Sequence, residues 1–200
     1  MKERGAWNMR ALTRGLWVGV ALAVTLALAR CDQSPPATPP PSHTIRGVPL
    51  ADYRANWCGP AALAAVLQFY GVSVTAADIA KEIYLPGYRG TLNLDLLLYA
   101  RKAGFDVWAG EGDAEKVKKA VARGRPVICM VRSRGRVVDR NHFVVIRGYD
   151  SLRRTWLLDD GTGKEVARRM LDFEKDWRDC GHWMLVVEGR KPTPAETGKP

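Results

Sequence analysis

The chain has 200 residues, enough for one compact domain with extensions and too few for a large multidomain protein. Lys and Arg outnumber Asp and Glu by 31 to 21, which gives a formal net charge of +10. Because the basic residues are scattered rather than interleaved with exposed aromatic side chains, the composition argues against a nucleic-acid-binding protein. We expect the positive charge to act toward an anionic membrane surface or cell wall instead.

The first thirty residues have the pattern of an export signal. A basic start is followed by fourteen uncharged residues at 16–29, a run that is short for a membrane span and suits a signal-peptide core. The sequence ALA at 27–29 fits an ordinary signal peptidase, whereas LARC at 28–31 resembles a lipoprotein box that would acylate Cys31. An uncleaved membrane anchor is the third alternative. In each case we expect an exported bacterial protein, periplasmic or tethered to the membrane as a lipoprotein.

Two segments of biased composition flank the expected domain. Residues 31–44 contain five prolines, a composition that cannot build a core and favours an extended tether. Residues 189–200 are charged and rich in proline, and we expect them to be disordered. The sequence therefore predicts a signal peptide at 1–30, the tether, one folded domain at 45–188 and the disordered tail.

Four segments in the first half of the domain predict helices. The first follows Cys58, where Pro60 suits an opening helical turn and a broadly apolar run extends to Gly71. Thr75 is an N-cap residue for the second helix, and glycines end the third and the fourth. These later helices are expected within residues 75–84, 91–104 and 113–124.

The pattern changes in the second half, where short apolar runs rich in β-forming residues predict strands. These runs are PVICMV at 126–131, HFVVIRGY at 142–149, TWLLDD at 155–160 and HWMLVV at 182–187. Helices followed by strands predict an α+β domain, in which a helical half packs on an antiparallel sheet.

Cys58 stands immediately before the most apolar predicted helix, in the sequence NWCGPAAL. The positive end of a helix dipole lowers the pKa of a thiol placed there. Gly59 allows a sharp turn and the close approach of a substrate to the backbone. A cysteine in this position is a candidate nucleophile, although a small core residue would fit the same position.

A histidine and two acids supply the remaining groups of a thiol protease site. His142 opens a predicted strand, so that its imidazole lies at a strand end and can take the proton of the nucleophile. Asp159 and Asp160 end the next predicted strand, and antiparallel pairing would bring an acid near the histidine to orient the imidazole. Taken one at a time, a half-buried structural histidine and a polar turn are alternative interpretations.

The motifs NWCGPAAL, HFVVIRGYD and LLDDG together resemble the papain-like peptidases related to the bacteriocin-processing, double-glycine leader peptidases. The likeness spans about residues 48–188, and YLPGYRGTLNLDLLLYARKAG is similar to an exported, often lipidated branch of that group. The resemblance implies a papain-like cysteine peptidase fold that needs no cofactor. It also implies that Cys58 is the nucleophile, His142 the general base and acid, and Asp159 the orienting acid, with Asp160 as substitute.

The sequence departs from the family at the residue that helps to bind the oxyanion. The family has a glutamine five or six residues before the cysteine, and Asp52 and Tyr53 stand at those positions. A carboxylate repels a developing oxyanion, and the loss of one donor costs about 3 kcal/mol of transition-state stabilisation. Beside the Cys58 N–H, the candidate donors are therefore the Asn56 amide and the Tyr53 hydroxyl.

The other cysteines and histidines give weaker signals. Cys129 lies inside a predicted strand and is expected in the core, with a disulfide to Cys180 as an open alternative in an oxidising compartment. Cys180 beside His182 is a rival thiol site, but it lacks a helix dipole. His43 falls in the tether and is expected to be solvated. These residues lack the paired spacing of a zinc site, and we expect no metal.

We therefore expect an exported thiol peptidase that cleaves a peptide or protein substrate by a Cys-His-Asp mechanism. Acyl transfer to an amine would use the same groups. A catalytically weak or inactive pseudopeptidase that binds a peptide or a partner is the alternative that the missing glutamine supports. A structural envelope lipoprotein without a peptide site is a third.

Overall fold

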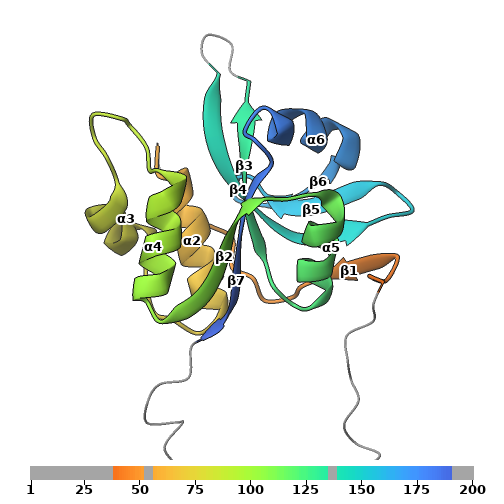
Figure 1. Cartoon of the computed structure of the whole chain (residues 1–200), viewed down its shortest axis with the longest axis horizontal. Helices are drawn as coiled ribbons and strands as arrows, with labels where there is room; N and C mark the ends of the chain where they lie inside the picture. The colour runs from red at the N-terminus through yellow and green to blue at the C-terminus, as the bar shows by residue number, and fades with distance from the viewer. Residues whose placement is uncertain (1–37, 52–55, 135–138, 191–200) are drawn as a thin grey trace, which may run out of the picture. The chain divides into compact units, whose positions relative to one another are not determined.

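Seven strands form an antiparallel sheet in the computed structural model, which describes residues 38–51, 56–134 and 139–190 (Figure 1). The strands run in the order β2-β7-β3-β4-β5-β6, and β1 pairs with β4 beside this path. Their bounds are β1 Ser42–Thr44, β2 Phe105–Glu111, β3 Val127–Ser133, β4 Arg140–Asp150, β5 Thr155–Asp159, β6 Glu165–Arg169 and β7 Trp183–Arg190. The described residues also form five helices: α2 Cys58–Phe69, α3 Ala76–Ile83, α4 Asn93–Lys102, α5 Ala114–Ala122 and α6 Met170–Arg178. The α+β class expected from the sequence is confirmed.

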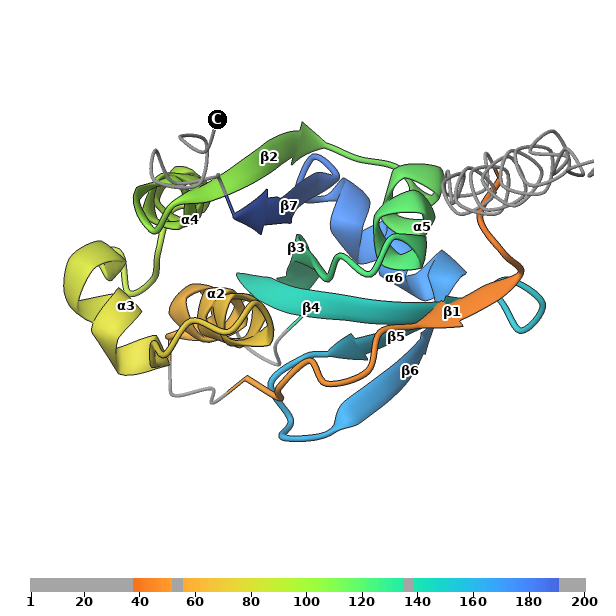
Figure 2. The same ribbon diagram turned by 90° about the horizontal axis from the view of Figure 1, so that it is seen from below.

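The helices α2, α3 and α4 gather on one side of the sheet and form a helical half, as the two perpendicular views show (Figures 1 and 2). Within this half, α2 contacts both α3 and α4, and it also contacts β4 of the sheet. The helices α5 and α6 instead pack on strands β3 and β4. The first residue of α2 therefore lies where the helical half meets the central strand.

Helix α2 is buried along most of its length. Every residue from Gly59 to Leu67 is buried, and most of their side chains are aliphatic. A helix that is apolar on all faces belongs inside a protein core, since burial of each large aliphatic side chain contributes about 1.5–3 kcal/mol. This burial holds α2 in place and with it the residue at its N-terminus.

Strand β4 is the longest strand and carries three partners. It pairs with β3 along one edge and with β5 along the other, while β1 takes the place beside residues 148–150, beyond the end of β3. Gly148 permits this arrangement, because a Cβ there would lie 3.0 Å from the His43 carbonyl oxygen and 3.1 Å from the Leu157 Cβ. A larger residue would push the neighbouring strands apart by a few tenths of an ångström.

The predicted elements are all present, with shifted ends, and the second helix shows the expected cap. Thr75 and Asp78 form a reciprocal capping box at the start of α3. Hydrogen bonds from Thr75 and then from Lys81 lower the pKa of Asp78 to about 2. The third helix begins at Asn93 rather than Thr91, and its N-cap residue, Leu92, makes no side-chain hydrogen bond to the first turn.

Four elements were not predicted from the sequence: β1, β2, β6 and α6. Strand β1 lies in the segment expected to be a tether, so the domain begins before residue 45, and His43 is half-buried rather than solvated. The Ser151 N–H donates to the Pro41 carbonyl at 2.8 Å and the Tyr149 hydroxyl to the Pro40 carbonyl at 2.9 Å. Residues 42–44 therefore join the sheet as β1, and the carbonyl groups of Pro40 and Pro41 hold the preceding residues to the end of β4.

In the part of the chain that the structure describes, none of the helices combines the length and the apolar character that crossing a membrane requires. The predicted disordered tail at 189–200 starts too early, because Gly189 and Arg190 belong to β7. The predicted export signal at 1–30, the lipidation candidate Cys31 and residues 191–200 of the tail lie outside the described residues.

Candidate active site

Cys58 is the first residue of α2 and is half-buried. Its neighbour Gly59 is packed tightly, since a Cβ there would lie 3.3 Å from the Phe143 ring and 3.3 Å from the Thr91 Cβ. The glycine thus lets the N-terminus of the helix approach strand β4 closely. The preceding cap residue, Trp57, makes no side-chain hydrogen bond to the first turn. Because Cys58 is the first residue of α2, its thiol lies at the positive end of the helix dipole.

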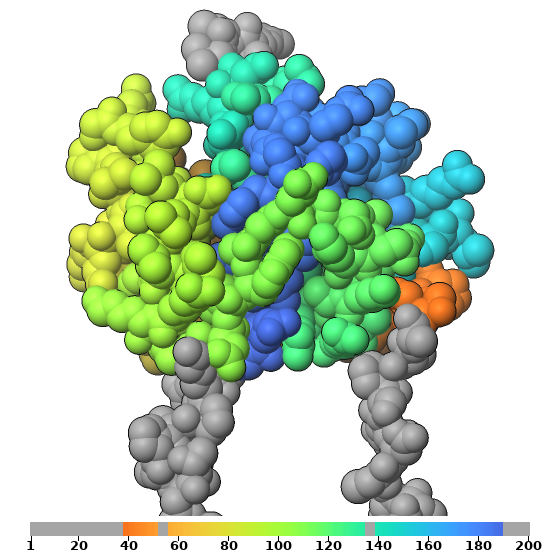
Figure 3. Space-filling view, viewed as in Figure 1, coloured from red at the N-terminus to blue at the C-terminus, as the bar shows by residue number. Residues whose placement is uncertain are grey.

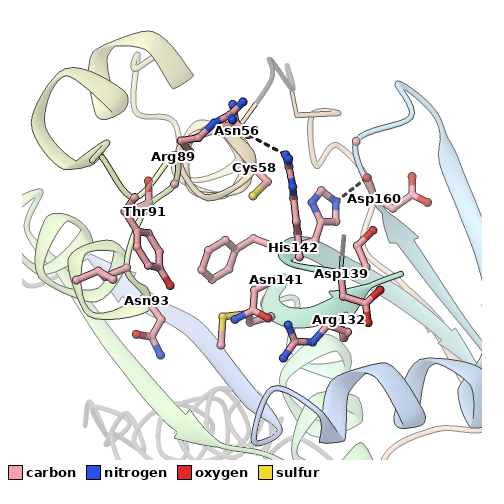
Figure 4. A pocket seen from close by; sticks show the side chains of 18 residues that line it. Asn56, Cys58, Arg89, Thr91, Asn93, Arg132, Asp139, Asn141, His142 and Asp160 are labelled. Atoms are coloured by element: carbon pink, nitrogen blue, oxygen red, sulfur yellow. Dashed lines mark hydrogen bonds between the residues drawn. The ribbon is translucent and has the colours of Figure 1, made fainter. Parts of the chain in front are cut away.

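His142 lies near the start of β4 and brings its imidazole to the Cys58 side chain. The other side of the ring is held by the main chain, because Nε2 lies 2.8 Å from the Asp160 carbonyl oxygen (Figure 4). A carbonyl only accepts, so Nε2 must carry a proton. Nδ1 is then the nitrogen left for the hydrogen bond with the Cys58 side chain.

The pKa values of the two side chains shift in opposite directions. Burial raises the pKa of Cys58, but hydrogen bonds from His142 and from the Phe143 main chain, with the charge of His142, outweigh it and lower the pKa below its usual value. Burial likewise lowers the pKa of His142, whereas its hydrogen bond with Cys58 and the Cys58 charge raise it above the usual value. Both shifts favour a thiolate beside an imidazolium.

The structure separates the two candidate acids. Asp159 is 1% exposed, and its carboxylate accepts hydrogen bonds from the main-chain N–H groups of Ala51 at 2.6 Å and Gly161 at 3.0 Å. Asp159 pairs with Val145, an odd number of residues from His142, so the two side chains lie on opposite faces of the sheet. The expectation that Asp159 orients the imidazole therefore does not fit the geometry.

Asp160 takes the position beside the histidine, although by its main chain rather than by its carboxylate. Its carbonyl oxygen accepts from His142, and the charge of its side chain also contributes to the raised pKa of that residue. The Asp160 carboxylate itself accepts a hydrogen bond from the Thr162 N–H at 3.2 Å. Its contribution is thus electrostatic.

One of the three residues considered for the oxyanion lies in the described part of the chain. Asn56 has a left-handed backbone conformation with φ of 67°, and its Oδ1 accepts from Arg140 Nη1 at 3.3 Å. Asparagine tolerates this conformation better than most residues. Asp52 and Tyr53 lie outside the described residues.

Cys58 and His142 open onto a cleft of about 760 Å³ between the segment before α4 and the strands β3 and β4. Figure 3 shows the surface hollowed between these two parts, drawn in yellow-green and teal. The cleft is lined by Asn56, Cys58, Tyr88, Arg89, Gly90, Thr91, Leu92, Asn93, Met130, Arg132, Ser133, Asp139, Arg140, Asn141, His142, Phe143, Asp160 and Gly161.

The other cysteines do not assemble a second thiol site. Cys129 is buried, as expected, and burial raises its pKa well above the usual value. Cys129 and Cys180 are both free thiols, so the alternative of a disulfide between them is not formed. The pKa of Cys180 is also raised, mainly by burial, and His182 contacts Glu174 instead. Within the described residues, no cluster of His, Cys, Asp and Glu side chains could hold a metal ion.

Several polar residues of the cleft were not singled out by the sequence. Arg89, Thr91, Arg132 and Asn141 have no motif of their own, and only the folding of two distant segments brings them to the cleft (Figure 4). The Thr91 hydroxyl is buried and finds no hydrogen-bond partner among the described residues.

A protein-family comparison matches residues 40–183 to the Peptidase C39-like family. The chain belongs to this family. A comparison with curated proteins finds no match.

Solved structures share the fold of this family member. A C39-like peptidase from Bacillus anthracis has 20% identity and a TM-score of 0.59, with 76% of this chain and 99% of that chain covered. Xylellain, a cysteine protease from Xylella fastidiosa, has 13% identity and a TM-score of 0.57, with 80% and 90% covered. A double-glycine-motif protease from an AMS/PCAT transporter, solved with its leader peptide, has 22% identity and a TM-score of 0.54, with 76% and 99% covered. The papain-like cysteine peptidase fold is confirmed.

Proposed function

We propose that the protein is an exported thiol peptidase in which Cys58 is the nucleophile and His142 the general base and acid. The observation that carries the proposal is the contact between the two side chains, which lowers the pKa of the thiol and raises that of the imidazole. Such a pair holds a reactive thiolate near neutral pH without a cofactor. The membership of a peptidase family supports the reaction class.

The reaction proceeds through an acyl-enzyme. The Cys58 thiolate attacks the peptide carbonyl carbon, and the resulting oxyanion takes a hydrogen bond from the Cys58 main-chain N–H. As the C–N bond breaks, His142 gives its Nδ1 proton to the leaving amine, and a thioester remains on the enzyme. His142 then takes a proton from a water molecule that attacks the thioester. This step releases the acid and restores the thiol.

The main-chain carbonyl of Asp160 has the orienting role in this proposal. Its hydrogen bond with Nε2 fixes the tautomer in which Nδ1 faces the sulfur. The nearby carboxylate of Asp160 adds negative charge that stabilises the imidazolium. Asp159 has a structural role, since its carboxylate joins the segment at Ala51 to the end of β5.

Comparison of two cysteine variants tests the proposal. Cys58→Ala is expected to abolish both turnover of a peptide library, measured by mass spectrometry, and rapid labelling by iodoacetamide. Cys180→Ala is the matched control, because Cys180 is also a half-buried thiol but has a raised pKa and lies outside the cleft. Equal loss in both variants, or turnover that survives in Cys58→Ala, would contradict the assignment.

A pseudopeptidase that binds peptides without cutting them is the second candidate, and the absence of glutamine at positions 52 and 53 favours it. If catalysis survives, Asn56 or Tyr53 must supply the missing donor. We then expect Asp52→Gln or Tyr53→Gln to accelerate acylation, and Asn56→Ala or Tyr53→Phe to slow it. A protein that binds peptides but turns over none in any of these variants is a pseudopeptidase.

Export and membrane attachment are part of the same proposal and are supported by the sequence pattern at 16–31 alone. We expect the wild-type chain, expressed in a bacterium, to incorporate labelled palmitate and to fractionate with membranes. Cys31→Ser should remove the label without preventing export if Cys31 is the acylated residue. If the Cys31→Ser chain keeps its label, another residue is acylated. Recovery of the wild-type chain in the cytoplasm would contradict export.

A further inference from the structure

Three arginines line the cleft on both of its walls. Arg89 belongs to the segment before α4, Arg132 to β3 and Arg140 to the start of β4. Among the described residues, none of the three forms an ion pair with a carboxylate, whereas Arg134 and Arg168, just outside the cleft, both pair with Asp176. The cleft therefore presents guanidinium groups whose charge is not neutralised by ion pairs of their own.

The two carboxylates of the cleft act on other partners. Asp160 accepts a hydrogen bond from Thr162 and acts on His142, as described above. Asp139 acts on Arg134, whose pKa is raised first by a hydrogen bond and the charge of Asp176 and then by the charges of Asp179 and Asp139. Neither acid pairs with a cleft arginine. Among the described residues that line the cleft, three arginines therefore stand against two aspartates.

The three arginines lie at different places around the cleft that contains Cys58 and His142. Arg140 Nη1 donates to Asn56, two residues before the nucleophile, so its guanidinium lies beside the Cys58 loop. Arg132 pairs in the sheet with Asn141, the residue before His142. Arg89 stands across the cleft from Arg132, and Figure 4 shows the two well separated. A peptide that lies over Cys58 passes within reach of positive charge on both walls.

The wall that carries Arg89 has two further unusual features. Arg89 has a φ of 52°, a left-handed conformation that is uncommon for residues other than glycine, asparagine and aspartate. Two residues later, Thr91 lines the cleft with 8% of its surface exposed, and its buried hydroxyl has no hydrogen-bond partner among the described residues. Left-handed backbone and an unsatisfied buried donor both cost stability, and residues with strained backbone cluster at active sites and ligand clamps.

We propose that the cleft selects acidic peptides, with Arg89, Arg132 and Arg140 holding carboxylate side chains on either side of the bond that faces Cys58. Guanidinium groups bind carboxylates with two parallel hydrogen bonds, which gives orientation as well as charge attraction. This inference rests on the proposed function, since it names the substrate class of the same site. It concerns binding, and it can be tested without turnover.

The test measures the affinity of two fluorescein-labelled peptides for the full-length Cys58→Ala protein by anisotropy. One peptide carries glutamates on both sides of a central Ala-Gly, and the other carries glutamines at the same positions. We expect the glutamate peptide to bind more tightly, with a preference that falls as salt is raised. Each of Arg89→Gln, Arg132→Gln and Arg140→Gln should reduce that preference about two- to fivefold, the value of one partly exposed ion pair.

Arg123→Gln is the matched control. Arg123 is exposed, and its replacement by glutamine removes the same charge as the cleft variants do. It follows the last residue of α5 and does not line the cleft. Equal affinity for the two peptides overturns the proposal, as does a control that lowers the preference as much as the cleft variants. A glutamate preference that depends on the cleft arginines, in a protein whose wild type cuts neither peptide nor any library member, supports the binding inference and contradicts the peptidase function.

Discussion

Asp159→Asn separates the structural role that we assign to this carboxylate from a direct role in catalysis. In the folded protein, one carboxylate oxygen accepts from the Ala51 N–H at 2.6 Å and the other from the Gly161 N–H at 3.0 Å. Asparagine keeps one acceptor and replaces the other with an amide nitrogen, which is a donor facing a donor. One buried N–H is then left without a partner.

The expected cost follows from these two contacts. A hydrogen bond to a charged group contributes about 1.5–3 kcal/mol, and a buried donor left unsatisfied costs about 1–3 kcal/mol. Since the remaining bond is retained in weaker form, we expect Asp159→Asn to lower the free energy of unfolding by about 2–4 kcal/mol. With a denaturant dependence of about 2 kcal/mol per molar urea, the midpoint should fall by about 1–2 M.

The assay pairs urea unfolding with the pH dependence of Cys58 alkylation, and the adjacent residue provides the control. In Asp160→Asn, the main-chain carbonyl that holds His142 is unchanged, and the Thr162 N–H keeps an acceptor. We expect its stability to change by less than about 0.5 kcal/mol. The pKa of His142 should fall in this variant, because the nearby negative charge is lost.

The opposite pattern would refute the reasoning. If Asp159→Asn unfolds at the wild-type urea concentration while Cys58 loses its reactivity in the folded protein, then Asp159 acts on His142 despite lying on the other face of the sheet.

Three further predictions concern the thiol, the buried hydroxyl and the first strand. In His142→Ala, burial continues to raise the pKa of Cys58 while its largest opposing contact is gone, so the alkylation midpoint should move upward; an unchanged midpoint would mean that the two side chains do not interact. Thr91→Val should raise the free energy of unfolding by about 1 kcal/mol, since it removes an unsatisfied buried hydroxyl at nearly constant volume, and a loss of stability in thermal melts would show that the hydroxyl has a partner. Removal of residues 1–44 should lower the melting temperature relative to removal of residues 1–37, because only the longer deletion removes β1 and the main-chain acceptors at Pro40 and Pro41. Equal melting temperatures would mean that residues 38–44 do not stabilise the domain and act as a tether.

The sequence alone determined the fold class, the family and the two residues that meet in the cleft. Cys58 could be singled out because a thiol at the start of a largely apolar helix lies at the positive end of the helix dipole, which lowers its pKa. His142 could be singled out because it opens an apolar strand, where a histidine is not needed for packing. Both signals depend on neighbouring residues in the sequence, so they can be recognised without the tertiary structure.

Strand β1 was not predicted, because its formation depends on the assembled sheet. The composition of residues 38–44 predicts an extended tether, and only the free edge of β4 beyond the end of β3 turns part of it into a strand. An edge that is vacant for pairing is a property of the assembled sheet.

Only the tertiary structure decided between the two acids and revealed the cleft arginines. Asp159 and Asp160 are equivalent in sequence, but side chains alternate across a sheet, and the register of β5 against β4 turns Asp159 to the face opposite His142. That register is set by the pairing of two strands, so no single segment encodes it. Likewise Arg89 and Arg132 come from segments forty residues apart, and they face one cleft because α2 packs the helical half against β4.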